Sequence, residues 1–263
     1  MPSFFCGFML SLAQKITGFK NGDKTMKPIE FSSMSNAHQN AKTKHPNIAF
    51  YAMDKQSIPQ LLGLQQTVYD ALDDDKKRFI LPKSKGYLTS HFANGSTAIG
   101  IGINGKHVAQ ALIAMPSEKN PNTCLIDFDL QHPLEELSVI QGLLVHPDFR
   151  GLKLGQLMIE VWIKIAEEAQ KKYCMAETET RNHYSWGLFL DAGVPIISTG
   201  HDAEDGADLF HHCHEIGAHV SDPEISHELD SQDFQTIRHF SQQGFIGTHH
   251  KNTPNGITLT FAK

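Results

Sequence analysis

The amino-acid sequence predicts an α/β (α+β) fold. Apolar strand patterns alternate with amphipathic helical patterns from Ile48 to Ile216, and an Asn-Gly pair separates two of the strands. A further apolar run continues through a glycine-containing loop into a long helix. The 263 residues are 40% hydrophobic and 20% charged, which is typical of a globular protein with one large domain or one domain with appendages.

The first five predicted elements are a strand, two helices and two strands, at residues 48–53, 56–72, 83–94, 96–103 and 107–115. Asn104-Gly105-Lys106 separates the last two. Because Asn and Gly adopt the positive φ angles of tight turns, this segment predicts a hairpin.

The later predicted elements alternate strand and helix and end in two strands, at residues 138–145, 155–173, 174–180, 184–191, 194–199 and 207–216. The helix from Gly155 gathers its charged side chains on one stripe, which makes it amphipathic. Gly193 stands where a glycine ends a helix, and residues 201–206 form a turn. We find no internal repeat.

The ends of the chain and its composition exclude several classes of protein. Residues 20–47 are polar and predict a linker. The apolar stretch Phe4–Leu12 has no basic segment before it and is far shorter than the roughly 20 residues of a membrane span, so it predicts neither anchor nor secretory signal. A net charge of −6 argues against nucleic-acid binding. Four widely spaced cysteines favour a reducing, cytoplasmic location.

The loop from Val145 to Gly155 is the first candidate site. A strand that runs directly into a helix presents unpaired backbone N–H groups at the positive end of the helix dipole. Gly151 and Gly155 would let the backbone approach an anion, and Arg150 and Lys153 add positive charge. This arrangement suits a pyrophosphate.

This segment resembles the core motif of the GCN5-related N-acetyltransferase (GNAT) family. In that family a strand ending in Val-x-Pro precedes Arg/Gln-x-x-Gly-x-Gly/Ala and a helix. Here residues 143–147 match the strand, Arg150 the first motif position and Gly155 the last, whereas Lys153 stands where the family usually has Gly.

A second match follows in residues 176–194. The family's Asn-x-x-Ala/Ser-x-x-Leu-Tyr-x-x-x-Gly-Phe pattern is met in register by Asn182, Ser185, Leu188, Phe189, Gly193 and Val194. The order of elements from Ile48 to Ile216 also resembles that of the family. The resemblance implies a mixed, mostly antiparallel central sheet with a splayed pair of parallel strands, flanked by helices. It divides the chain into an extension (1–46), an acetyltransferase domain (47–216) and an appendage (217–263).

The resemblance implies that the protein binds acetyl-CoA. The pyrophosphate would lie on the N–H groups of residues 151–156, and the pantetheine arm would pair with the backbone of Leu143, Leu144 and Val145. A strand N–H near Leu144 or Val145 would polarise the thioester carbonyl. The implied cofactor-binding residues are Leu143, Leu144, Val145, Arg150, Gly151, Leu152, Lys153, Leu154, Gly155, Gln156, Asn182 and Phe189.

A carboxylate would help to deprotonate the attacking amine, whose pKa is near ~10. Glu177 lies five residues before Asn182, where some family members carry a general base. Strand alternation puts Glu177 and Glu179 on one face, about 7 Å apart, where two carboxylates would raise the pKa of at least one. The alternative is that both are solvated strand residues in surface pairs.

The usual general acid of the family is missing. Many members protonate the departing thiolate with a Tyr at the position of Phe189. Tyr184 would lie about 140° around the helix from Phe189 and cannot replace it. Ser185 lies one turn before Phe189, and either Ser185 or water would then serve.

The histidines of segment 211–214 and His219 suggest a metal site, but alternation along a strand lets no more than two side chains converge. We therefore expect no metal. The sequence predicts an acetyl-CoA-dependent N-acetyltransferase that acts on a primary amine of a small molecule, peptide or protein. The alternative is a catalytically weak module of the same fold that binds acyl-CoA or a protein partner. We expect neither nucleic acid nor membrane as a partner, and the sequence leaves a homodimer open.

Overall fold

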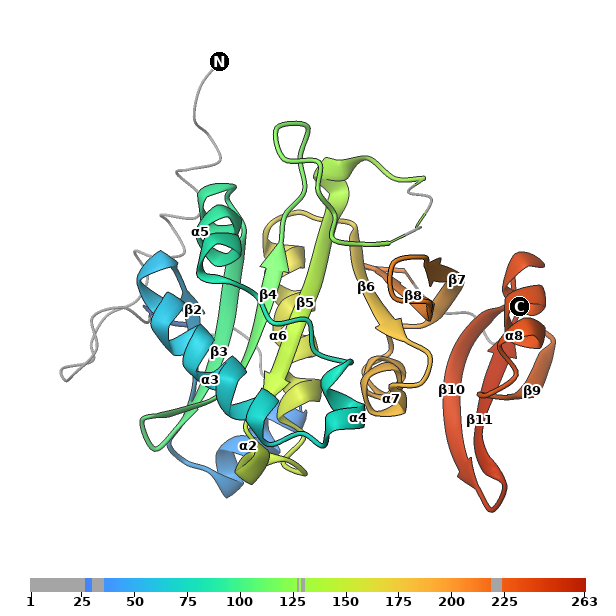
Figure 1. The fold of residues 1–263 in the computed structure, drawn as a ribbon, viewed down its shortest axis with the longest axis horizontal. Helices are drawn as coiled ribbons and strands as arrows, with labels where there is room; N and C mark the ends of the chain where they lie inside the picture. The colour runs from blue at the N-terminus through green and yellow to red at the C-terminus, as the bar shows by residue number, and fades with distance from the viewer. Residues whose placement is uncertain (1–26, 30–35, 127, 129–130, 219–223) are drawn as a thin grey trace.

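The computed structural model describes residues 27–29, 36–126, 128, 131–218 and 224–263, so the apolar stretch 4–12 lies outside the described residues. Its centre is one eleven-stranded sheet with the order β1-β2-β3-β4-β5-β6-β8-β7-β10-β11-β9 (Figure 1). No helix in the described ranges is long and apolar enough to cross a membrane.

The strands are β1 (Lys27–Pro28), β2 (Ile48–Met53), β3 (Thr97–Ile103), β4 (Lys106–Ala114), β5 (Leu137–Val145), β6 (Tyr173–Glu179), β7 (Ile196–Asp202), β8 (Ala207–Glu215), β9 (Ser226–Asp230), β10 (Ile246–Thr253) and β11 (Gly256–Ala262). The helices are α2 (Asn36–Lys44), α3 (Ile58–Asp70), α4 (Asp74–Lys77), α5 (Lys85–Ala93), α6 (Leu154–Glu168), α7 (His183–Asp191) and α8 (Phe234–Gln242). Three single 3₁₀ turns are η1 (Lys55–Ser57), η2 (Leu134–Glu136) and η3 (Pro147–Phe149).

Helices cover both faces of the sheet (Figure 1). Strand β4 shows how its side chains divide between them. Ala111 and Ile113 pack in a core with α6, whereas Leu112 packs in a core with α3 and α5. We call the side of α3, α4 and α5 the front face. The Asn104-Gly105 hairpin between β3 and β4 is present, with φ of 52° and 77° at these residues.

Strands β5 and β6 form a parallel pair in a sheet that is otherwise antiparallel. They pair at only three positions, from Leu137↔Tyr173 to Val139↔Met175. Beyond these positions the two strands part, so the second half of β5 presents a backbone edge that no other strand of the described residues pairs with on that side. The predicted fold class, a mixed sheet with one splayed parallel pair and flanking helices, is confirmed.

Two segments differ from the sequence prediction near the N-terminus. Helix α2 lies within the predicted linker 20–47, where Ala41 reaches the core and His38 packs edge-on against Phe50 at 4.6 Å between ring centroids. Among the residues of α2 whose burial is described, Ala41 alone is buried, which is too little for a periodic pattern. The four-residue helix α4 was also not predicted.

The order of elements recurs along the chain, which the sequence analysis does not predict. Beyond residue 216 the chain continues the same sheet through β9, α8, β10 and β11. These elements repeat the order of β6, α7, β7 and β8, because in each set the last strand lies between the first two. The division of the chain into three parts remains a prediction.

Candidate functional site

The loop before α6 has the backbone geometry expected of an anion site. It runs from η3 through Gly151, whose φ is +78°, to Lys153, whose φ is +59°. Lys153 is the N-cap residue of α6, and the first helical bond is donated by the Leu157 N–H to the Lys153 carbonyl (3.1 Å). The preceding N–H groups therefore have no partner within the helix. Arg150 and Lys153 are both exposed beside them.

The packing of two helices requires glycine at position 155. The sequence suggested instead that Gly155 lets the backbone approach an anion. A Cβ placed there would lie 2.7 Å from Cδ2 of Leu188 on α7 and 3.6 Å from Cδ2 of Leu143 on β5. Gly155 therefore lets α6 approach α7 closely. Leu154 is buried in the core and Leu152 packs against it, so only the backbone of these residues could face a ligand. Gln156 is half-buried in the first turn.

The open edge of β5 begins beside a β-bulge. Between Gln141 and Leu144 the strand has one residue more than β4 opposite it, and Gly142 takes a φ of +57°. The bulge turns the strand at the point where it leaves β6. Leu144 is buried against α3, whereas Leu143 and Val145 pack toward α6, so their backbone lines the gap between the two strands.

Glu177 holds the loop that covers the front of β6. Its Oε2 accepts the Ile126 N–H at 2.6 Å and lies 3.4 Å from Nε2 of His211. His211 lies opposite Glu177 on β8 and is 1% exposed. Its Nε2 is also 3.0 Å from the Ile126 carbonyl, and its Nδ1 is 3.0 Å from Oγ of Ser198. A carboxylate and an imidazole thus hold both backbone groups of one loop residue.

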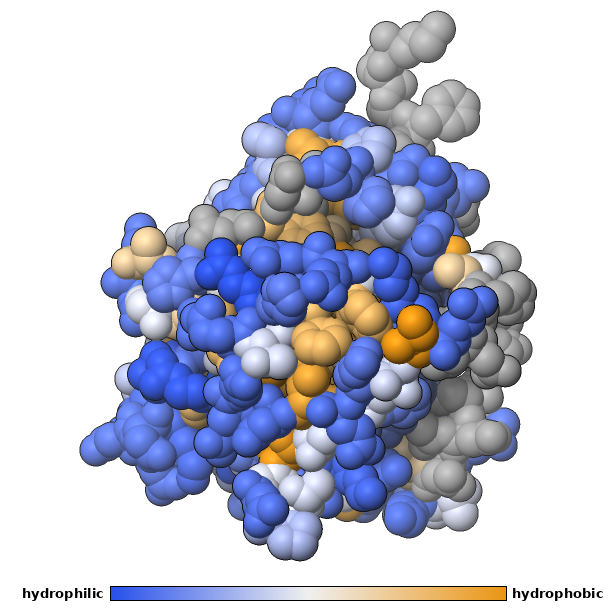
Figure 2. All heavy atoms as spheres, turned by 90° about the vertical axis from the view of Figure 1, so that its right-hand side faces the viewer, coloured by the Kyte–Doolittle hydropathy of each residue, from blue (hydrophilic) through white to orange (hydrophobic). Residues whose placement is uncertain are grey.

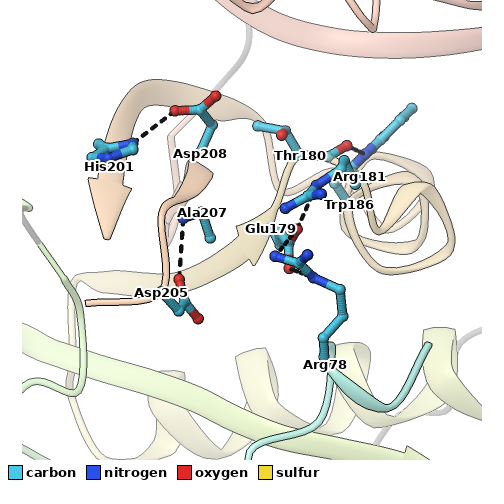
Figure 3. Close-up of polar contacts among 9 residues, drawn as sticks. All are labelled: Arg78, Glu179, Thr180, Arg181, Trp186, His201, Asp205, Ala207 and Asp208. Atoms are coloured by element: carbon cyan, nitrogen blue, oxygen red, sulfur yellow. Dashed lines mark hydrogen bonds and ion pairs between the residues drawn. The ribbon is translucent and has the colours of Figure 1, made fainter. Parts of the chain in front are cut away.

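Glu179 lies between two guanidinium groups, as Figure 3 shows. Its Oε1 is 3.2 Å from Arg78 at the end of α4 and 2.8 Å from Arg181, and its side chain is 11% exposed. These ion pairs neutralise the carboxylate and tie α4 to β6. Glu179 is therefore held in ion pairs, and its part in catalysis stays a prediction. Arg78 could not be predicted as a partner, because it lies 101 residues before Glu179.

Helix α7 presents the second set of predicted residues. Asn182 is its N-cap, and its carbonyl accepts the Ser185 N–H at 2.9 Å. Ser185 is half-buried and Tyr184 is 76% exposed. Phe189 is 5% exposed and lies in the core, with its ring centroid 6.4 Å from Trp162 and 5.0 Å from His212. A hydroxyl at Phe189 would therefore enter packed surroundings.

A polar cluster that the sequence did not predict lies beside the bulge. Tyr87 on α5 donates its hydroxyl to Oε1 of Gln141 at 2.9 Å and lies 3.4 Å from Sγ of Cys124. The Gln141 amide also donates to this sulfur at 3.4 Å. Burial and the neighbouring Cys124 raise the pKa of Tyr87 above its ordinary value. The cluster forms only when α5, β5 and the loop that carries Cys124 come together in the fold, so it could not be predicted from the sequence.

The strand histidines make separate contacts. His212 is fully buried, with Nε2 3.0 Å from the Thr178 hydroxyl and Nδ1 3.2 Å from the Val194 carbonyl. Burial lowers the pKa of His212 to about 3. His219 lies outside the described residues. Within the described part of the chain, no three His, Cys, Asp or Glu side chains come close enough to hold a metal ion.

Comparison with known proteins gives one family match. Residues 66–193 match the model of the Acetyltransferase (GNAT) family. No curated protein sequence matches the chain.

Solved structures give a likeness of fold. The ribosomal-protein-S18-alanine N-acetyltransferase from Escherichia coli is 14% identical, with a TM-score of 0.50 over 68% of this chain and 99% of that one. An N-acetyltransferase from Staphylococcus aureus is 12% identical, with a TM-score of 0.48 over 64% and 98%. Also similar is yncA from Salmonella typhimurium with its cofactor acetyl-CoA, at 16% identity and a TM-score of 0.47 over 68% and 99%.

Proposed function

Since residues 66–193 form a domain of the acetyltransferase (GNAT) family, we propose that the protein transfers an acetyl group from acetyl-CoA to a primary amine, which attacks the thioester directly. The observation that carries the proposal is that an open strand edge, that of β5, leads directly to a helix, α6, whose first N–H groups have no side-chain cap. The edge of β5 from the bulge to Val145 leads through the Gly151 turn into the N-terminus of α6.

The residues present fit acetyl-CoA. Pyrophosphate oxygens accept hydrogen bonds from the N–H groups of residues 151–156, with Arg150 and Lys153 as cations beside them. The pantetheine arm, which carries amide groups, pairs with the backbone of Leu143, Leu144 and Val145 as an additional strand. A backbone N–H near Leu144 or Val145 polarises the thioester carbonyl. Asn182 borders the arm at the start of α7, whereas the Phe189 ring that the resemblance places there is buried in the core.

Glu177 is the residue that takes the proton from the amine. Its Oε2 accepts an N–H group, that of Ile126, and this contact supports a role as an acceptor. An acceptor amine displaces Ile126 or reaches Glu177 through a water. Glu179 serves instead to fix Arg78 and Arg181, because both guanidinium groups bind its carboxylate. Ser185 or water returns a proton to the thiolate.

The second candidate is a module that binds acyl-CoA or a protein without turnover. It is favoured by Phe189, which occupies the position of the family's usual acid and is buried in the core. The two candidates share the site and differ only in whether free thiol appears when an amine is present.

The test is Glu177→Gln, with Glu179→Gln as the matched variant on the same face. The Gln amide oxygen still accepts the Ile126 N–H, so the loop stays in place. We expect kcat/KM to fall by roughly 10² or more, while CoA affinity measured by calorimetry stays unchanged. A loss in Glu179→Gln alone would assign the base to the other residue. If neither variant loses activity, a carboxylate base is not used.

A further inference from the structure

The second half of the sheet is built twice. Strands β6 and β7 are joined by α7, and β8 lies between them, antiparallel to both. Strands β9 and β10 are joined by α8, and β11 lies between them, antiparallel to both. Each set is therefore a strand, a crossover helix and a hairpin whose last strand returns to the middle. We call residues 173–216 the first half-unit and residues 224–263 the second half-unit.

The two half-units also match residue by residue. Five positions of the α7 motif recur 51 residues later as the pairs Asn182/Asp233, Ser185/Thr236, Phe189/Phe240, Gly193/Gly244 and Val194/Phe245. Each helix ends alike, because Gly193 and Gly244 have φ of +74° and +83°. In both copies the next residue donates its N–H to the carbonyl of the motif's Phe, from Val194 to Phe189 at 2.9 Å and from Phe245 to Phe240 at 3.2 Å.

The hairpins share their register and their irregularity. In the first, Ile196 pairs with His212 and Ser198 with His211, so that one residue of β7 bulges out. In the second, Gly247 pairs with Phe261 and His249 with Thr260, and the bulge falls at the equivalent position of β10. A bulge at the same place in a separate hairpin marks a duplicated unit.

A pseudo-two-fold axis relates the copies. Strands β7 and β10 meet antiparallel at Ile196↔Gly247, and these two residues are themselves equivalent, 51 positions apart. The strand order is reversed across this junction. As the symmetry requires, α7 packs on β10 and α8 packs on β7. Trp186 and Leu190 of α7 share a buried core with Ile237 of α8 and Phe261 of β11.

The second half-unit is incomplete. Its β9 corresponds to β6, which pairs with β5, but among the described residues no strand lies on the outer edge of β9. Ile225 is 53% exposed there, whereas its counterpart Cys174 is fully buried. The chain has no second copy of the glycine loop either. Figure 2 shows this end of the molecule as a mainly hydrophilic face with a narrow apolar strip.

We propose that the edge of β7 and the outer side of α7 form an interaction surface that fits a copy of the same half-unit, and that the second half-unit fills it within the chain. This inference is independent of the proposed acetyl transfer. The contact between the two half-units of one chain thus has the geometry that a two-fold interface between two chains would have. The 263-residue chain is therefore a monomer.

The first test is the mass of the full-length protein by light scattering. We expect 29.3 kDa, the mass of one chain. A stable dimer would overturn the proposal.

The second test is Gly247→Val in the full-length chain. A Cβ at Gly247 would lie 3.1 Å from both Cβ of Ile196 and the Phe261 ring, so a branched side chain forces β10 away from β7. We expect the freed surface to pair with the same surface of another chain, first half-unit on first half-unit, which gives a dimer at high concentration. Lys251→Ala, at an exposed position of the same strand, should stay monomeric. A Gly247→Val protein that stays monomeric overturns the proposal.

If Gly247→Val does not fold, Gly247→Ala decides in the same way. Acrylamide quenching of Trp186, which is 1% exposed and packs edge-on against His250 at 5.6 Å, reports whether the junction has opened. We expect increased quenching together with dimer formation. Increased quenching in a monomer, or unchanged quenching, contradicts the inference.

Discussion

Acidification from pH 7 to pH 5 should destabilise the protein through His212. This imidazole lies beneath α7, in contact with the Phe189 ring, and both its nitrogens face polar partners, the Thr178 hydroxyl and the Val194 carbonyl. This arrangement suits the neutral ring, which donates from Nδ1 and accepts at Nε2. Burial and the neighbouring His211 lower the pKa of His212 from 6.5 to about 3.

The sign and size follow from linkage. In the unfolded chain His212 takes up a proton below pH 6.5, whereas in the folded protein it stays neutral down to about pH 3. Its stabilising contribution is therefore complete above pH 6.5 and is lost as the pH falls. pH 5 lies about 1.5 units below the pKa of 6.5 that His212 has in the unfolded chain. At 1.36 kcal/mol per unit, protonation of the unfolded chain lowers the free energy of unfolding by about 2 kcal/mol.

The assay is urea unfolding at pH 7 and pH 5 for the wild type, His212→Gln and His183→Gln. A glutamine amide can also donate to the Val194 carbonyl and accept from Thr178, so the fold is kept. We expect the wild type to lose about 2 kcal/mol more than His212→Gln between the two pH values. His183 is exposed, so His183→Gln should lose as much as the wild type. Equal losses in the wild type and His212→Gln would refute the reasoning.

Three further substitutions test the site. Gly155→Ala should lower the free energy of unfolding by about 1–3 kcal/mol, because the new Cβ meets Leu188, and Leu188→Ala in the same chain should recover part of this loss. If the two substitutions change the free energy of unfolding additively in urea, the contact between the new Cβ and Leu188 is excluded. Lys153→Gly should raise the free energy of unfolding by up to ~1 kcal/mol, because glycine adopts the left-handed backbone of this position without strain. It should also weaken CoA binding, because one cation is lost. Tighter CoA binding in calorimetry would show instead that the Lys153 side chain obstructs the loop. Phe189→Tyr should cost about 1–3 kcal/mol of stability because it overfills the core beside Trp162, and an unchanged unfolding midpoint would place that ring at the edge of the cleft instead.

Local patterns predicted most of the elements between Ile48 and Ile216. The Asn104-Gly105 turn and the amphipathic helix that starts near Gly155 depend on neighbouring residues alone, and both form as expected. The second half-unit was missed although its motif is readable at a spacing of 51. Asp233 and Thr236 replace Asn182 and Ser185, so at these positions the recurrence is one of chemical type rather than of identity.

The site shows where local reasoning ends. The strand alternation of Glu177 and Glu179 could be predicted, because it needs only a period of two. Their partners could not, since Arg78 and Ile126 are brought to them by tertiary packing over many residues. His211 could have been found from the register of β6 against β8, which the sequence does not fix.

The most direct test of the acetyltransferase proposal is the release of free thiol from acetyl-CoA by the purified protein across a panel of primary amines, compared with a sample without amine. We predict thiol release that depends on an amine and on protein concentration, together with one acetyl-CoA bound per chain in calorimetry. Binding of acetyl-CoA without any amine-dependent thiol release would contradict the enzyme and leave the binding module, and the absence of both would contradict the site itself.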